Sequence, residues 1–144
     1  MVHLPAERKE EKRAIDQAGD TLERFGIGHL AHRHADSLSL KEQRCLEIAR
    51  SVVSDPCLLL LDEPAAGLNI RETEEMAEII KGLGQQGLTI LLVEHDMSLV
   101  MSIAQRVIVL HHGLKIAEGP PEEIQENPDV IKAYLGGSST QLGS

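Results

Sequence analysis

Two short apolar runs, each followed by acidic residues, dominate the hydrophobic pattern of this chain. Residues 57–62 are Cys-Leu-Leu-Leu-Leu-Asp, and residues 88–93 are Leu-Thr-Ile-Leu-Leu-Val followed by Glu-His-Asp. Runs that are apolar throughout are typical of strands buried on both faces of a parallel sheet. Residues 71–81 carry apolar positions at helical spacing, and Gly82 and Gly84 are expected to end that helix. The order strand, helix, strand predicts a βαβ unit.

Helices and a hairpin are predicted on either side of this unit. The apolar spacing within residues 6–24 fits an exposed amphipathic helix. Residues 40–53 fit a second helix, because Ser39 and Glu42 form the Ser-x-x-Glu capping box that starts helices. The other expected elements are a polar connector, a short helix, a hairpin and two short helices, over residues 29–37, 97–104, 106–110 with 114–117, 121–126 and 128–135. The Gly/Ser/Thr-rich tail, residues 137–144, is expected to be disordered.

The composition narrows the function classes. Of the 144 residues, 42% are hydrophobic and 26% are charged, which is usual for a globular domain with its own core. Phe25 and Tyr134 are the whole aromatic inventory, which excludes a base-stacking platform for single-stranded nucleic acid. The net charge of −9 argues against a general binder of nucleic acid or of acidic membranes. No apolar run approaches the roughly 20 residues of a membrane span, and no signal peptide is expected, so a role at a membrane would need a partner.

The cysteines and the clustered histidines do not predict a metal site. Cys45 and Cys57 fall in predicted core elements without metal-ligand spacing, which favours a reducing cytosolic compartment. His29, His32 and His34 lie together in the connector, but no other ligand is near in sequence. A solvated linker is the favoured interpretation of these histidines.

The adjacent carboxylates Asp62 and Glu63 are the strongest chemical feature of the chain. They follow an apolar run, as acids do when a buried strand delivers them to a site at its carboxyl end. Neighbours along a strand point to opposite faces, so one acid would face a metal and the other a water molecule. Nucleotide hydrolysis needs that division between Mg²⁺ and a polarised attacking water. A core strand that ends in solvated acids explains the same pattern equally well.

Three motifs in fixed order resemble the second half of the nucleotide-binding domain of ABC transporters. They are Leu38-Ser39 with Leu46–Arg50, then Leu58–Pro64, then Leu91–Asp96. In that family they correspond to the signature helix, the Walker B strand and the switch histidine. The closer resemblance is to the ATP-binding subunits of branched-chain amino acid importers, and it is carried by Asp62–Asn69, Ala117–Gly119, Pro121–Ile124 and Asn127–Gly136.

The resemblance implies an α/β fold, a partial P-loop NTPase of the ABC nucleotide-binding type. It would have a parallel β core, a C-terminal hairpin and flanking helices, with the N-terminal strands and Walker A missing. Residues 1–56 would belong to the helical subdomain with the signature helix. Residues 57–136 would be the C-terminal part of the ATPase core. The protein would work in the cytoplasm, at the inner face of the membrane, through membrane subunits and a second ATP-binding subunit.

The resemblance also assigns roles toward the cofactors ATP and Mg²⁺. Asp62 would hold Mg²⁺, Glu63 would act as general base on the attacking water, and His95 would contact the γ-phosphate. Ser39 would offer its hydroxyl and nearby backbone N–H groups to a phosphate of the partner's ATP. The D-loop that faces the opposite subunit would be formed by Ala66, Gly67 and Asn69.

The chain departs from the family pattern in two places. It holds no Gly-x-x-x-x-Gly-Lys-Ser/Thr, so the phosphate cradle is absent, as are the adenine-stacking aromatic and the Q-loop glutamine. The family's Leu-Ser-Gly-Gly-Gln is here Leu38-Ser39-Leu40-Lys41-Glu42. Lys41 would obstruct the close approach that glycine allows, or would meet a phosphate as a charge. Because the capping box alone explains Ser39 and Glu42, a structural helix start is favoured over a working signature.

Three hypotheses follow from these departures. The first is an importer ATPase subunit in truncated form with little activity alone. The second is a non-enzymatic module that pairs with another ATPase half or a transporter subunit. The third, a relative of DNA-repair ATPases, is disfavoured by the net charge of −9. Without the Walker A strand, the strand at residues 88–93 would keep an unpaired edge. This predicts a homo-oligomer, a domain-swapped dimer, or a fold rearranged to cover that edge, for the isolated chain.

Overall fold

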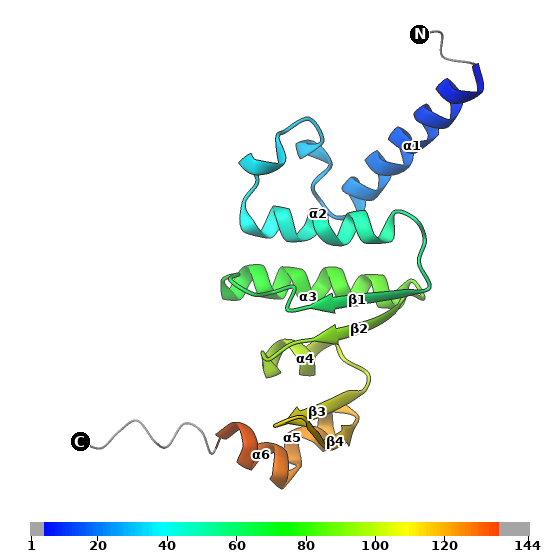
Figure 1. The fold of residues 1–144 in the computed structure, drawn as a ribbon. Coiled ribbons are helices and arrows are strands. Elements are labelled where there is room, and N and C mark those ends of the chain that lie inside the picture. Colours follow the sequence, from blue (N-terminus) through cyan, green and yellow to red (C-terminus); the bar gives the residue numbers. More distant parts are fainter. Residues whose placement is uncertain (1–4, 136–144) are drawn as a thin grey trace. The chain divides into compact units, whose positions relative to one another are not determined.

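The fold consists of two compact units in a computed structural model, residues 1–93 and residues 94–144. The structure describes residues 5–135, so the predicted disordered tail lies outside the described residues. The first unit contains α1 (Pro5–Arg24), η1 (Gly28–Leu30), η2 (Ala35–Ser37), α2 (Leu40–Val52), β1 (Leu58–Asp62), α3 (Ile70–Gln85) and β2 (Thr89–Val93) (Figure 1). The second contains α4 (Met97–Ile103), β3 (Val107–His111), β4 (Leu114–Gly119), α5 (Pro121–Glu126) and α6 (Pro128–Leu135).

The predicted βαβ unit is confirmed in the first unit. Strands β1 and β2 pair in parallel, with Leu58 opposite Thr89 and Asp62 opposite Val93, and α3 connects them. Helices α2 and α3 lie side by side (Figure 1). Most of the core of this unit comes from α2, β1 and α3, namely Cys45, Ile48, Ala49, Val52, Leu59, Leu61, Met76, Ala77, Ile80 and Leu83, and Phe25, Ile27, Leu30 and Ala65 are buried as well.

The expectation that both strands are buried on both faces is wrong within the described residues. Burial alternates along β1, where Leu59 and Leu61 are buried while Leu58 and Leu60 are 49% and 65% exposed. On β2, Leu91 and Val93 are exposed in the same way. An apolar run does not say which of its two faces is covered, because that depends on the elements packed against the sheet.

Helix α3 continues through Gly82 and Gly84, where the sequence pattern predicted its end. Leu83, between the two glycines, is buried on the same face as Met76 and Ile80. Burying a leucine side chain stabilises by about 1.5–3 kcal/mol, which offsets a glycine cost of about 1 kcal/mol each. The helix ends one turn later, where Gly87 adopts a left-handed φ of 94°.

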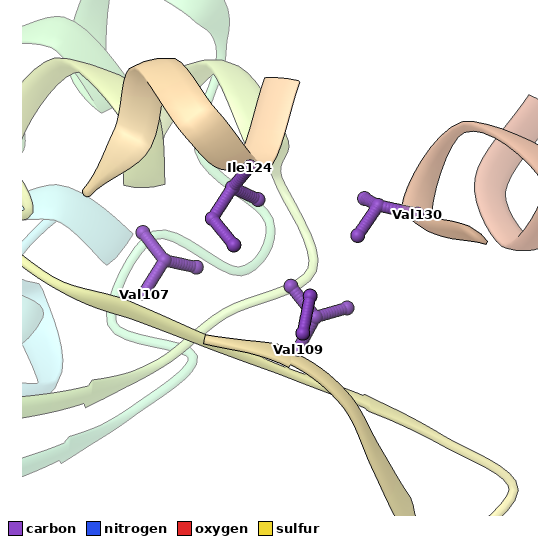
Figure 2. Close-up of a cluster of buried hydrophobic side chains, with 5 residues drawn as sticks. Val107, Val109, Ile124 and Val130 are labelled. Atoms are coloured by element: carbon purple, nitrogen blue, oxygen red, sulfur yellow. The ribbon is translucent and has the colours of Figure 1, made fainter. Parts of the chain in front are cut away.

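The second unit confirms the predicted hairpin and the two helices that follow it. Strands β3 and β4 are antiparallel and turn at His112 and Gly113, whose φ values of 47° and 77° suit a two-residue turn. Figure 2 shows Ile124 of α5 directed toward the hairpin valines. The buried cluster consists of Val107, Val109, Ala117, Ile124 and Val130.

The remaining predictions have mixed outcomes. Helix α1 is confirmed as an exposed helix, and the connector contains the short helices η1 and η2. The placement of Cys57 in the core is wrong, since its side chain is exposed, whereas Cys45 is buried and burial raises the pKa of its thiol. The boundary predicted after residue 56 separates two segments with different expected roles. The division into compact units falls elsewhere, after Val93, and does not test that boundary, which stays a prediction. None of the described helices has the length and apolar character needed to cross a membrane.

Candidate functional site

Glu63 lies in the turn that follows β1 and not in the strand itself. Strand β1 ends at Asp62, and Glu63 adopts a left-handed φ of 46°. Its backbone N–H donates to the carbonyl oxygen of Val93 at 2.9 Å, which extends the link between β1 and β2 by one bond. The prediction that the two acids alternate along a strand is therefore wrong, because the left-handed turn sets the direction of Glu63. A non-glycine residue in this conformation costs about 1–2 kcal/mol, and such strain is concentrated at functional sites.

Asp62 lines a cleft at the carboxyl end of β1. The cleft has a volume of about 190 Å³ and lies between β1 and α2, lined by Arg44, Glu47, Ile48, Ser51, Leu60, Leu61, Asp62 and Pro64. Arg44 Nη1 donates to Glu47 Oε2 at 2.9 Å. Arg44 Nε is buried and has no hydrogen-bond partner within the described part of the chain. The cleft therefore combines two exposed carboxylates, Asp62 and the Arg44-paired Glu47, with a guanidinium that retains an unused donor.

A Mg²⁺ ion fits Asp62 only when a nucleotide supplies further ligands. No group of three or more His, Cys, Asp or Glu side chains among residues 5–135 is placed to hold a metal. Mg²⁺ in nucleotide sites is held by one or two carboxylates together with phosphate oxygens and water. The exposed carboxylate of Asp62 fits that shared arrangement and not a metal site made by the protein alone.

His95 belongs to the second unit, just before α4. Its backbone N–H donates to Glu94 Oε2 at 3.3 Å. Asp96 caps α4, since its Oδ1 accepts from the backbone N–H groups of Ser98 at 2.9 Å and Leu99 at 3.2 Å. The imidazole thus follows β2 at the start of a short helix, and its predicted role beside Asp62 and Glu63 stays a prediction.

The predicted capping box at the start of α2 is confirmed. Ser39 Oγ accepts from the Glu42 backbone N–H at 3.3 Å, and the Ser39 backbone N–H donates to Glu42 Oε2 at 2.7 Å. The Ser39 backbone N–H, and then its hydroxyl, hold the pKa of the Glu42 carboxyl below its usual range. A phosphate at this helix start would have to displace Glu42 from the Ser39 N–H.

Lys41 is engaged by a carboxylate of the neighbouring helix. Its Nζ pairs with Glu75 Oε2 on α3, and Arg71 Nε pairs with the other oxygen, Oε1, at 3.0 Å. The hydrogen bond from Lys41, followed by that from Arg71, holds the pKa of the Glu75 carboxyl below its usual range. This side chain stands where the family has a glycine, and it ties α2 to α3. The sequence pattern did not indicate this pair, because Lys41 and Glu75 are 34 residues apart.

Of the predicted D-loop residues, Gly67 lies against the start of α2. Gly67 adopts a left-handed φ of 81°, and a Cβ atom there would stand 3.0 Å from Leu40 Cδ2. Asn69 caps α3, since its Oδ1 accepts from the Glu72 N–H at 3.0 Å while Glu72 Oε2 accepts from the Asn69 N–H at 3.0 Å. This second capping box was missed, although Asn-x-x-Glu in the sequence is its pattern. The structure thus brings Gly67 together with the Leu40 turn, and half-buried Ala66 precedes it.

Comparisons with known proteins identify relatives of this chain. A description of the ABC transporter family matches residues 2–66, and one of the branched-chain amino acid ATP-binding cassette transporter matches residues 115–139. The high-affinity branched-chain amino acid transport ATP-binding protein LivG of Salmonella typhimurium is 50% identical over 137 residues, which are 94% of this chain and 54% of LivG. This chain belongs to the family of branched-chain amino acid ABC transporter ATP-binding proteins.

Other members of the family match over the same extent. BraF of Pseudomonas aeruginosa, a high-affinity branched-chain amino acid transport ATP-binding protein, is 47% identical over 94% of this chain and 54% of its own length. The chain spans about half the length of the curated relatives it matches.

Solved structures of ABC ATPases support the fold assignment. The ADP conformation of an ATP-binding cassette of an ABC transporter superposes with a TM-score of 0.79 at 27% identity, over 86% of this chain and 50% of that chain. A nucleotide-free ATP-binding cassette gives a TM-score of 0.77 at 25% identity, over 92% and 51%. The α/β fold is therefore a partial ABC nucleotide-binding domain, as predicted.

We predict that Ser39→Ala destabilises the first unit by about 1 kcal/mol, because the Glu42 N–H loses its acceptor. Ser39→Asn retains an acceptor and is expected to stay close to the original stability. Urea unfolding followed by circular dichroism at pH 7 measures both variants. Equal unfolding midpoints for Ser39→Ala and the original chain would contradict a stabilising cap.

We predict that Lys41→Met lowers the urea midpoint at pH 7 and that this difference shrinks in acid. The folded-state pKa of Glu75 lies below the ordinary carboxyl value of 4.5, so its stabilising contribution is fully present above pH 4.5. It is lost as the pH falls through the folded-state pKa, because the protonated carboxyl no longer attracts Lys41. Lys81→Met, an exposed position on α3, serves as the control. A difference that is independent of pH would argue against the ion pair.

Proposed function

We propose that this chain contributes the Walker B carboxylates, the D-loop and the switch histidine to the ATP-binding component of a branched-chain amino acid importer. The observation that carries the proposal is the 50% identity to LivG over 137 residues, a stretch long enough to include all of these positions. The placement of Asp62 at the carboxyl end of a parallel strand, with Glu63 in the next turn, is compatible with it.

In this proposal the residues divide the work of ATP hydrolysis. Asp62 would hold Mg²⁺, which would supply positive charge beside the phosphates of the nucleotide. Glu63 accepts the proton of a water molecule whose oxygen bonds to the γ-phosphorus, while the bond to the β,γ-bridging oxygen breaks. His95 donates a hydrogen bond to a γ-phosphate oxygen. Because no Walker A is present in the 144 residues, the isolated chain is expected to bind ATP weakly and to hydrolyse little.

The assembly proposed for the chain follows that of an importer. Membrane subunits and a second ATP-binding subunit are the proposed partners, at the cytoplasmic face of the membrane. Gly67 and Asn69, in the D-loop, would face the second subunit, and Ser39 would face a phosphate of its ATP.

A second candidate function is a non-catalytic module that pairs with another ATPase half. It is favoured because the residues at the altered signature already have partners within the chain. The Ser39 N–H donates to Glu42, and Lys41 is paired with Glu75. A module with these side chains would keep the fold and the pairing surfaces while it contributes nothing to a phosphate site.

A chimeric LivG distinguishes the two candidates. The part of Escherichia coli LivG that this chain matches at 49% identity is replaced by this chain, and leucine uptake and ATP hydrolysis are measured in the assembled importer. Hydrolysis above that of the Glu63→Gln chimera, raised further by Lys41→Gly, supports the first candidate. A folded chimera that binds ATP but does not hydrolyse it, with or without Lys41→Gly, overturns it in favour of the second.

A further inference from the structure

A second cleft lies in the first unit, where the C-terminal ends of α1, α2 and α3 meet. It has a volume of about 200 Å³. Arg24 is the last residue of α1, Val52 is the last residue of α2, and Gln86 directly follows α3, and all three line the cleft. It shares no lining residue with the cleft beside Asp62, so it is a separate feature of the fold.

The inner wall of this cleft is aliphatic. Val52 and Leu83 line it and are buried, and Pro56 and Leu88 line it and are half-buried. A cavity of about 150 Å³ with an aliphatic and aromatic lining is large enough to bind benzene. The cleft therefore has room for an aliphatic side chain of leucine size, with the polar part of the same ligand at the mouth.

The mouth of the cleft carries a guanidinium that can receive a carboxylate. Arg24 is exposed there, and its Nη2 donates to Gln86 Oε1, which orients the side chain. Arg24 forms no ion pair within the described part of the chain. A guanidinium has five N–H donors in a fork that matches a carboxylate, so the bond to Gln86 leaves donors for a ligand.

The same mouth offers negative charge to a cation. Asp55 lines the cleft, is exposed, and forms no ion pair with another residue in the described range 5–135. Its backbone N–H donates to the carbonyl oxygen of Val52 at 3.0 Å, which ties the Asp55 turn to the end of α2. The C-terminal ends of α2 and α3 add partial negative charge, because their last carbonyl groups point out of the helices.

We propose that this cleft binds a free α-amino acid with an aliphatic side chain. The carboxylate of the ligand pairs with Arg24 and its ammonium group pairs with Asp55. Its side chain lies against Val52 and Leu83. A simple carboxylic acid would leave Asp55 without a partner, and a simple amine would leave Arg24 without one, so the three features together select the zwitterion. The binding is independent of the proposed function, whereas an effect of the imported amino acid on its own importer rests on that function.

Calorimetric titration of the full 144-residue chain with L-leucine, in the absence of nucleotide, tests the proposal. We expect saturable one-to-one binding, with shifted amide resonances at Asp55, Gly87 and Leu88. Isocaproate lacks the ammonium group and isoamylamine lacks the carboxylate, so each is expected to bind at least tenfold more weakly. The absence of saturable L-leucine binding, or equal affinity for isocaproate or isoamylamine, overturns the proposal.

Substitutions at the mouth place the ligand in the cleft. Arg24→Met and Asp55→Asn are each expected to weaken L-leucine binding at least tenfold, and asparagine tolerates the left-handed φ of 51° at this position. Arg50→Met and Asp20→Asn are the matched controls, since both residues are exposed in the same unit and do not line the cleft. Gln86→Glu replaces a variant that does not fold, because a carboxylate beside Arg24 competes with that of the ligand. Unchanged affinity in the cleft variants, or an equal loss in the controls, overturns the proposed site.

The amino acid site and the proposed function fail separately. Binding of L-leucine is measured on the isolated chain without ATP, whereas the function is measured as hydrolysis by the chimera. An active chimera together with a chain that does not bind L-leucine would refute only the amino acid site. A chain that binds L-leucine, together with a chimera that is inactive with or without Lys41→Gly, would refute only the proposed function.

Discussion

Glu63→Gln in the LivG chimera is expected to lower the rate of ATP hydrolysis by roughly 10²- to 10⁴-fold, the range that a general base contributes. The amide cannot accept the proton of the attacking water, while its size and polarity leave nucleotide binding in place. Glutamine also retains the backbone N–H that donates to Val93, so the turn is expected to survive. Steady-state phosphate release and equilibrium dialysis of ATP measure the two effects separately.

Glu78→Gln is the matched control for this experiment, because Glu78 is an exposed glutamate on α3 away from the turn. Its hydrolysis rate is expected to equal that of the unmodified chimera. If Glu63→Gln stays within threefold of the control, Glu63 is not the general base and the first candidate function loses its central residue. Loss of ATP binding together with hydrolysis would instead assign Glu63 a role in holding the nucleotide site.

Features set by neighbouring residues were predictable from the sequence. The capping box at Ser39, the turn at His112 and Gly113, and the N-terminal proline of α5 depend on side chains within a few residues of one another. The parallel pairing of β1 with β2 was also predictable, because the crossover helix between two apolar runs leaves few other arrangements.

Features set by distant packing were not predictable. Helix α3 extends past two glycines because Leu83 is buried in the core of the first unit. The residues near Leu83 in the sequence do not indicate that burial. Leu60 is exposed although Leu59 and Leu61 are buried, since the cover on each face of the sheet comes from other elements. The position of Glu63 follows from its bond to Val93, a residue on another strand.

The candidate site was predictable in its residue types and not in its geometry. The order of the motifs located Asp62 and Glu63, because both acids lie where the apolar run of β1 ends. The sequence left open whether Lys41 meets a phosphate. In the structure Lys41 forms an ion pair with Glu75. This contact depends on α2 and α3 lying side by side. The predicted grouping of His95 with the two acids rests on the family resemblance alone.

Met76→Ala is expected to destabilise the first unit by about 2–5 kcal/mol. Met76 is 0% exposed and lies on the face of α3 that also buries Ala77, Ile80 and Leu83. Truncation to alanine removes most of the side chain from a closed site, so the lost burial and the cavity left behind both lower the free energy of unfolding.

Amide hydrogen exchange measures this loss within each unit, because a chain of two compact units does not guarantee one cooperative unfolding transition. The amides of β1 and β2 are expected to lose protection in Met76→Ala, while those of β3 and β4 keep theirs. Ile70→Ala, on the same helix at an 81% exposed position, is expected to stay within about 0.5 kcal/mol of the original chain. Equal losses of protection in all four strands would instead indicate that the two units unfold together.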